Sequence, residues 1–111
     1  MRLVDLEGQL YRYAGEKTFS PVNTVEEADS VMFLCPKCYA DNNGPVGTHS
    51  IRVDFAGKNV PEDVCMHNGE GNAVWWNASG TNINDLTLTP SIQILKCCGW
   101  HGWVTNGETV G

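Results

Sequence analysis

Alternating apolar and polar positions mark several ordered segments of this chain. The stretch HSIRVDF sets Ile51, Val53 and Phe55 against polar neighbours, which is typical of a strand with one solvated face. VMFLC is a compact apolar run that leads directly into Cys35 and is typical of a buried strand. GQLYRY, AVWWN, LTLTPSIQIL and GWVTNGETV supply further strand-like segments. These patterns predict a mainly β protein.

Turn and cap signals refine this picture. Asn106-Gly107 stands between WVT and ETV, the strongest short-range signal of a β-hairpin. Thr24 followed by Glu27 is the capping-box pattern and predicts a short helix over residues 25–30. YADNNGPVGTH and AGKNVPEDVCMHNGEGN are long loops by composition. We therefore expect a small α+β fold, mainly β, with long loops and one short helix.

Length and charge restrict the class of protein. The 111 residues predict a single domain over 1–111, and the net charge of −6 argues against nucleic acid as a partner. The chain has no apolar run long enough for a signal peptide or a membrane span, so we expect it in the cytoplasm. The oligomeric state cannot be inferred from these features.

Two short-spaced ligand pairs carry the chemistry of the sequence. Cys35 and Cys38 form a C-x-x-C, and Cys98 and His101 form a C-x-x-H. Two such pairs far apart in sequence are what a closed tetrahedral zinc site needs, and a closed site is structural. The sequence predicts one structural Zn²⁺ with three thiolate ligands and one imidazole, in a zinc-ribbon-like β domain whose fold depends on the ion.

Other interpretations of the cysteines stay open. Cys35 and Cys38 could form a redox dithiol, although such motifs place the first cysteine at a helix N-terminus, whereas here a loop is expected. A four-thiolate iron site would need Cys97 or Cys65, and the cysteines of the two pairs could also be buried free thiols. Cys65 and His67 form a further C-x-H pair in a long loop. His49 is expected to pack or hydrogen-bond rather than to bind metal.

The sequence also resembles a known family. FLCPKCYADNNGPVGTHS, DLTLTPSIQI, CGWHGWVTNGE and the opening MRLVDLEGQLYRY are similar to small bacteriophage and prophage proteins of unknown function, often called ammonia monooxygenase. These proteins are similar in turn to a broader set of bacterial zinc-binding domains, some encoded beside ubiquitin-like conjugation genes. The enzyme name does not suit this chain, because true ammonia monooxygenase is a membrane-embedded copper enzyme.

The resemblance implies particular residues. It places zinc ligands at Cys35, Cys38, Cys98 and His101. Related sequences tend to have glycine in place of Cys97, which makes Cys97 incidental to the site and predicts that its side chain points away.

Four tryptophans are candidates for an interaction surface, because Trp is enriched at protein-binding hot spots: Trp75, Trp76, Trp100 and Trp103. No Ser-His-Asp order or pair of catalytic carboxylates is apparent, which favours a protein that is not an enzyme. Our leading hypothesis is a small phage-encoded zinc protein that binds a host or phage protein, for example a factor of a defence system. The alternatives are a metalloenzyme with an open zinc site and a virion or assembly component.

Overall fold

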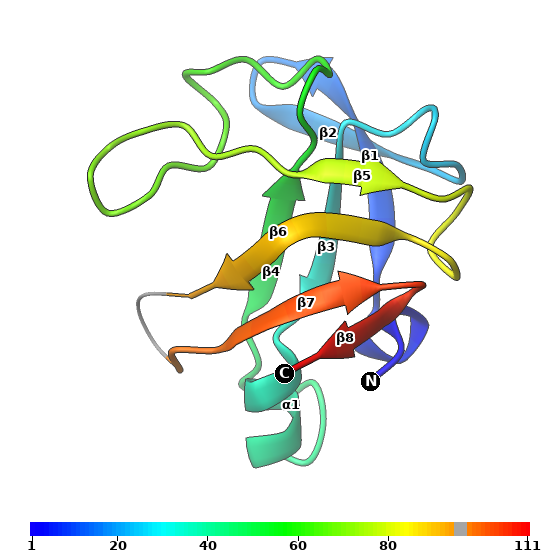
Figure 1. Ribbon diagram of the computed structural model, residues 1–111, viewed down its shortest axis with the longest axis vertical. Helices are drawn as coiled ribbons and strands as arrows, with labels where there is room; N and C mark the ends of the chain where they lie inside the picture. Colours follow the sequence, from blue (N-terminus) through cyan, green and yellow to red (C-terminus); the bar gives the residue numbers. More distant parts are fainter. Residues whose placement is uncertain (95–97) are drawn as a thin grey trace.

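Two antiparallel sheets form the body of the computed structural model, which describes residues 1–94 and 98–111 (Figure 1). The first sheet has the strand order β2-β1-β3-β4 and follows a short 3-10 helix, η1, at Leu3–Leu6. All of its strand pairs are antiparallel. Its strands are β1 (Gln9–Gly15), β2 (Thr18–Val22), β3 (Ser30–Leu34) and β4 (Ser50–Asp54).

The second sheet has the order β5-β6-β7-β8 and crosses in front of the first in Figure 1. Its strands also pair antiparallel, but the register of β6 with β7 shifts between Leu88 and Ile92. Pro90 lies inside this irregular stretch, where its missing N–H removes no regular ladder bond. The strands are β5 (Asn77–Ser79), β6 (Thr87–Gln93), β7 (His101–Thr105) and β8 (Glu108–Val110).

The core fills the space between the sheets. Phe33 of the first sheet and Val104 of the second are almost fully buried. Along β7 the burial alternates, so Gly102 and Val104 face the core whereas His101 and Trp103 face solvent. A Cβ added to Gly102 would lie 2.6 Å from the ring of the buried Trp100. The outer face of β7 therefore carries its polar and aromatic chemistry, and its inner face is filled.

The short helix α1 (Pro36–Asp41) begins directly after Cys35, in a stretch where the sequence predicted a loop. Pro36 occupies the first helical position, where its fixed φ and missing N–H are favourable. The mainly β fold with one short helix is confirmed for the described residues, although the helix lies elsewhere than predicted.

The predicted helix over residues 25–30 was wrong. The capping contacts do form, because the Glu27 N–H donates to Thr24 Oγ1 at 3.2 Å and the hydroxyl donates to the Glu27 carboxylate at 2.7 Å. They close only a turn, since β3 already begins at Ser30 and pairs with its neighbours from there. Strand pairing overrides the local helix signal.

The hairpin prediction was correct. Asn106 and Gly107 join β7 to β8 with φ values of 50° and 79°, the left-handed values of a type I′ turn.

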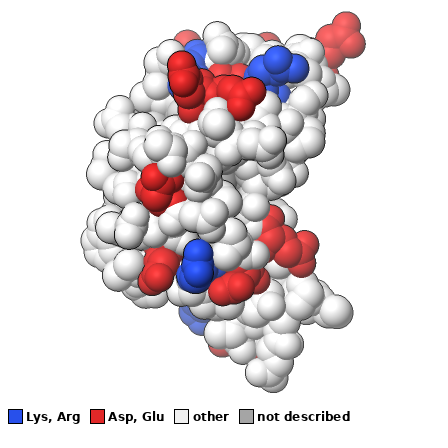
Figure 2. Space-filling view, turned by 90° about the vertical axis from the view of Figure 1, so that its right-hand side faces the viewer, with Lys and Arg blue, Asp and Glu red and all other residues white. Residues whose placement is uncertain are grey.

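On the side of the molecule seen in Figure 2, carboxylates are scattered with a few basic side chains among them and form no continuous patch of one sign. Among the described helices none is long and apolar enough to cross a membrane.

Candidate functional site

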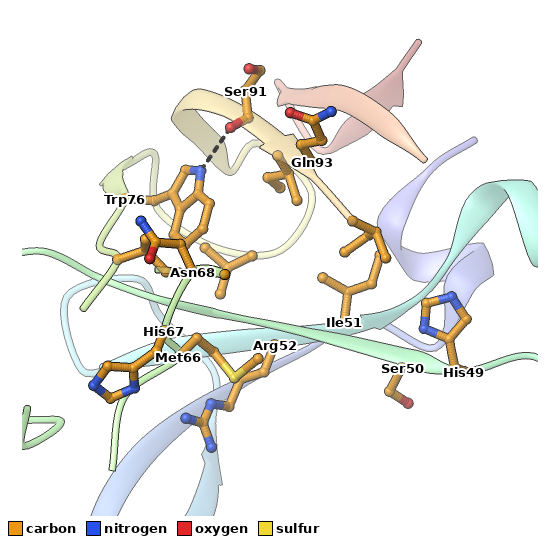
Figure 3. A pocket seen from close by; sticks show the side chains of 15 residues that line it. His49, Ser50, Ile51, Arg52, Met66, His67, Asn68, Trp76, Ser91 and Gln93 are labelled. Carbon is orange, nitrogen blue, oxygen red and sulfur yellow. Dashed lines mark hydrogen bonds between the residues drawn. The ribbon is translucent and has the colours of Figure 1, made fainter. Parts of the chain in front are cut away.

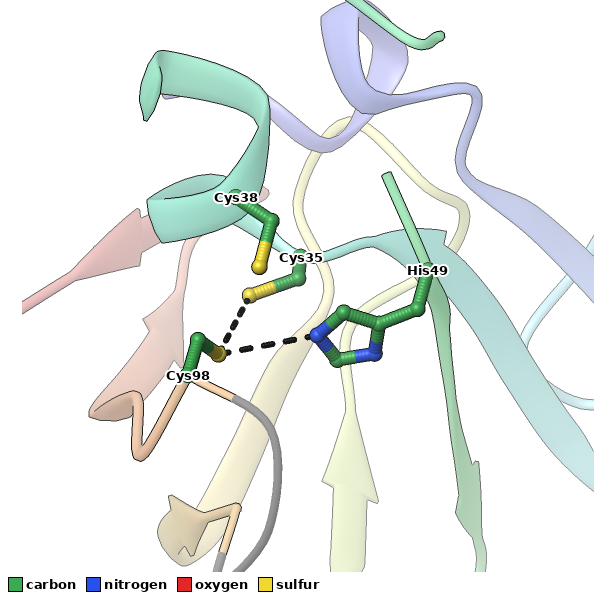
Figure 4. A group of neighbouring side chains, drawn as sticks. All are labelled: Cys35, Cys38, His49 and Cys98. Atoms are coloured by element: carbon green, nitrogen blue, oxygen red, sulfur yellow. Dashed lines mark hydrogen bonds between the residues drawn. The ribbon is translucent and has the colours of Figure 1, made fainter. Parts of the chain in front are cut away.

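Three cysteines and one histidine converge where the first sheet meets α1 (Figure 4). Cys35 follows β3, Cys38 lies in α1, His49 directly precedes β4, and Cys98 lies in the turn before β7. Their ligand atoms all lie within 4.8 Å of one another. These four residues, the Cys₃His cluster, could hold one metal ion.

Strand pairing creates half of this cluster. The Cys35 N–H donates to the His49 carbonyl at 2.9 Å, which extends the antiparallel ladder of β3 and β4 by one pair. The residue after one strand and the residue before the next therefore lie side by side. Cys38 is one turn of α1 away from Cys35, and so it points to the same side.

The spacing of the ligand atoms suits a tetrahedral ion. Cys35 Sγ lies 3.4 Å from Cys98 Sγ, which lies 3.5 Å from His49 Nε2. Bonds of ~2.3 Å in a tetrahedron put ligand atoms about 3.8 Å apart, so a small contraction or expansion of the cluster would admit the ion. Cys35 is fully buried and the other three side chains are half-buried.

The cluster holds its protons unevenly. Burial raises the pKa of Cys35, and burial together with the neighbouring Cys98 and Cys35 thiols raises the pKa of Cys38 to about 12. Burial acts in the same direction on Cys98, but contacts from His49, the Trp100 backbone and the other two thiols outweigh it and lower its pKa to about 6. One thiolate is thus stabilised next to an imidazole, as a metal-binding thiolate requires.

The sequence-based assignment of His101 as the fourth ligand does not match this arrangement. The structure brings together Cys35, Cys38 and Cys98, and the histidine beside them is His49 rather than His101. His101 opens β7 on the outer face of the second sheet, because its pairing with Gln93 directs the side chain away from the cluster. The four residues that the structure groups are therefore Cys35, Cys38, His49 and Cys98, without His101.

His101 takes part in a second polar contact instead. Its Nε2 lies 3.0 Å from Ser91 Oγ in the neighbouring strand β6. The imidazole also stacks on the indole of Trp103, with ring centroids 5.5 Å apart and an interplanar angle of 28°. Trp103 is 45% exposed, so this stack lies on the surface. Ser91 and His101 have the contact that a serine nucleophile and its base require.

The side chain of Trp76 holds the backbone of Ser91 in place. The indole N–H of Trp76 donates to the Ser91 carbonyl at 3.2 Å, just before β5 begins. The register shift in β6 ends at Ile92, so Ser91 lies at the irregular stretch rather than in a regular ladder. No carboxylate among the described residues hydrogen-bonds to His101, and the pair is a dyad there.

The remaining candidate residues lie apart from both contacts. Cys65 is buried outside the cluster and donates to the Glu62 carbonyl at 3.1 Å, and burial raises its pKa. His67 forms an isolated bridge with Ala73 in the long loop. Cys97, expected to point away from the metal, lies outside the described residues.

The four tryptophans do not form one surface. Trp100 is buried and packs edge-on against Phe33, with ring centroids 6.3 Å apart. Trp75 and Trp76 are half-buried, and Trp103 is the most exposed of the four. A tryptophan-rich interaction surface therefore reduces to Trp103 and its neighbours on β7 and β8.

Comparison with known proteins bears on the family. A search of curated proteins and a search of solved structures each find no significant match. The family model described as "Bacterial ubiquitination-like system serine protease (BubE)" matches residues 7–110, almost the whole chain. The similarity to proteins encoded beside ubiquitin-like conjugation genes pointed in the same direction. This chain belongs to the BubE family of bacterial ubiquitination-like systems.

Proposed function

We propose that this protein is a serine protease of a bacterial ubiquitination-like system, with Ser91 as nucleophile and His101 as general base. The observation that carries the proposal is the 3.0 Å contact between Ser91 Oγ and His101 Nε2. Hydrogen-bond reach between a hydroxyl and an imidazole is the geometric requirement for this chemistry. The description of the family as serine proteases supports the type of activity proposed.

The reaction follows the general scheme of serine hydrolases. Ser91 Oγ attacks the carbonyl carbon of a peptide bond while its proton passes to His101 Nε2. The imidazolium then gives that proton to the leaving amine, and an acyl ester remains on Ser91. A water molecule, deprotonated by His101, hydrolyses the ester and restores the hydroxyl.

In this proposal Trp103 orients the imidazole of His101 and stabilises its positive charge, two roles that a carboxylate has in a catalytic triad. The indole stacks on the imidazole with an interplanar angle of 28° and limits its rotation. When His101 is protonated, the aromatic face also stabilises its charge by about 0.5–1 kcal/mol, as expected for an exposed cation–π contact. Trp103 is thus a positioning residue in this proposal.

The Cys₃His cluster has a structural role in the same proposal. Three thiolates and one imidazole are a ligand set that suits Zn²⁺, and four protein ligands leave no position for a reactive water. Bound zinc would hold together β3, α1, β4 and the turn that carries Cys98. That turn leads within three residues to His101, so the ion supports the base without touching the substrate.

Recognition of a partner protein remains a second candidate function. Trp103 and Val110, 45% and 52% exposed, pair across β7 and β8 beside His101. Exposed aromatic residues of this kind are frequent anchors of protein interfaces. The phage or host partner proposed from the sequence would bind here, either as a substrate or as a target that is bound without being cleaved.

An active-site probe tests the protease without knowledge of its substrate. A fluorophosphonate should add covalently to wild-type protein at Ser91, as mapped by mass spectrometry. Ser91→Ala should abolish labelling and His101→Ala should reduce it strongly, whereas Ser79→Ala, an exposed serine on β5, should leave it unchanged. Equal labelling of wild type and Ser91→Ala would reject the assignment.

A further inference from the structure

A groove of about 660 Å³ runs between β4 and the end of β6 (Figure 3). Ile51, Met66 and Trp76 line its apolar part, and Ser91 belongs to its wall. In Figure 3 the Ser91 hydroxyl points away from the groove, on the side where it meets His101. No Asp or Glu is among the described lining residues, although the chain has 13 acidic residues. The groove thus leads up to the dyad and presents no carboxylate.

The edge of β4 turns unused backbone groups into this groove. The Cys35–His49 bond and the bond from Phe55 N–H to the Asp29 carbonyl, both 2.9 Å, show that alternate residues of β4 bond to β3. By this alternation the N–H and C=O groups of Ser50 and Arg52 point the other way. They have no hydrogen-bond partner among the described residues. Ser50 and Arg52 both line the groove.

The far end of the same edge already accepts an added segment. The Trp76 N–H donates to the Asp54 carbonyl at 3.0 Å, and the Ala56 N–H donates to the Trp76 carbonyl at 2.8 Å. Phe55 and Trp76 thereby form a parallel bridge. The Asp54 carboxylate also accepts the Met66 N–H at 2.8 Å, which ties the long loop to β4. The groove is therefore already formed, and within residues 1–94 and 98–111 the edge of β4 lacks partners only at Ser50 and Arg52.

A second hollow, of about 590 Å³, lies on the other side of the dyad. His101 and the buried Trp100 line it, together with Pro36 and Lys37 at the start of α1. Ser91 borders the first hollow and His101 borders the second. The contact between these two side chains therefore joins one residue of each hollow.

We infer that the groove binds an extended segment of a polypeptide substrate as an added strand on the edge of β4. This inference rests on the proposed protease function. Strand addition supplies main-chain hydrogen bonds that do not depend on sequence, and the apolar wall holds alternate side chains. The substrate leaves the groove over Ser91, where the scissile bond meets the hydroxyl, and continues into the second hollow. The ligand class is an unfolded or loosely folded stretch of protein, rather than a small metabolite.

A pair of substitutions at one position tests the strand edge. Ser50→Pro removes the N–H that faces the groove and leaves the ladder to β3 intact, as proline does on strand edges. Ser50→Ala keeps that N–H and is the matched control. Profiling with a proteome-derived peptide library and mass spectrometry should show kcat/KM about three- to tenfold lower for Ser50→Pro only. Metal content and fluorophosphonate labelling should match wild type in both variants.

The substrate side gives a second, independent readout. The best-cleaved library peptide is resynthesised with a single N-methyl group at successive positions on one side of the scissile bond. Loss of cleavage at every second position is expected, because alternate N–H groups of an added strand face β4. Uniform sensitivity along the peptide, or equal cleavage by Ser50→Pro and Ser50→Ala, overturns the inference. So does a library without any cleaved peptide while Ser91 is still labelled. Absence of Ser91 labelling instead rejects the protease itself.

Discussion

Cys98 and His101 stand three residues apart, yet they belong to two clusters of opposite character. Cys98 joins three other potential metal ligands in a cluster in which Cys35 is buried and the other three residues are half-buried. His101 lies on an open sheet face beside Ser91 and Trp103. Gly99, with φ at +68°, lets the chain turn between the two. One short segment thus connects a site suited to hold the fold with a site suited to do chemistry.

Removal of the metal should have the largest effect on this pair of sites. We expect a strong chelator, or Cys98→Ser, to unfold most of the chain. Structural zinc contributes about 10–16 kcal/mol in small domains, which matches or exceeds a typical stability of ~5–15 kcal/mol. Circular dichroism and bound-zinc measurements test this. Cys65→Ala, outside the cluster, is the control and should keep its metal; a folded, zinc-free Cys98→Ser would contradict the structural role.

Replacing each of the two histidines, His49 and His101, in a separate variant tests whether the two sites are independent. His101→Ala should keep zinc and lower kcat/KM on the order of 10²–10⁴-fold, since it removes a general base. His49→Ala should lose zinc and, with it, the fold. Zinc content, thermal unfolding and peptide cleavage measured on both variants decide the matter. Loss of zinc in His101→Ala with retention in His49→Ala would restore the assignment made from the sequence.

Metal uptake should depend steeply on pH, because the thiols of the cluster must lose their protons to bind the ion. Near pH 7.5 Cys98 is ionised, because its pKa is about 6, and Cys35 and Cys38 hold protons because their pKa values are raised. Binding then releases about two protons, so affinity rises about 100-fold per pH unit in this range. Below pH 6 Cys98 must also lose its proton, and affinity falls more steeply. Calorimetry in buffers of different ionisation enthalpy measures the proton count; a count of zero would contradict it.

The smallest effect is expected at Trp103. Trp103→Leu removes the aromatic face and should lower kcat about two- to fivefold, in line with ~0.5–1 kcal/mol for an exposed cation–π contact. Trp103→Phe should recover part of the loss, and KM for a short peptide should change little. Val110→Ala, across the β7–β8 pair, serves as the control. A rise in KM without a change in kcat would assign Trp103 to partner recognition instead.

The fold was predictable where local chemistry and pairing agree. Asn106-Gly107 requires left-handed backbone that few other residue pairs adopt, and the alternation around Ile51 and Val53 matches β4. The turn at Thr24 to Glu27 was not predictable, because the capping contacts are real and only the pairing of β3 prevents a helix. Local signals thus hold until a neighbouring strand competes with them.

The functional residues show the same limit. Sequence spacing identified the three cysteines of the cluster, since C-x-x-C brings two thiols together locally. It missed His49, although pairing VMFLC with HSIRVDF as antiparallel strands would have placed His49 opposite Cys35. It also gave no sign of Ser91, the nucleophile that we propose, because the register of β6 against β7 shifts at that point and no motif in sequence encodes the shift.

Gly102 decides more than its size suggests. A slip of β7 by one residue against β6 would turn His101 and Trp103 inward and expose Val104, which now faces the core. The position of Gly102 has space for hydrogen alone, since a Cβ would collide with the Val110 carbonyl oxygen and with the Trp100 ring. An imidazole or an indole cannot enter there, so the slipped pairing is excluded as the chain folds. The contact between His101 and Ser91 in each folded molecule, on which the proposed protease depends, is thus secured by Gly102, which belongs to neither side chain of that pair.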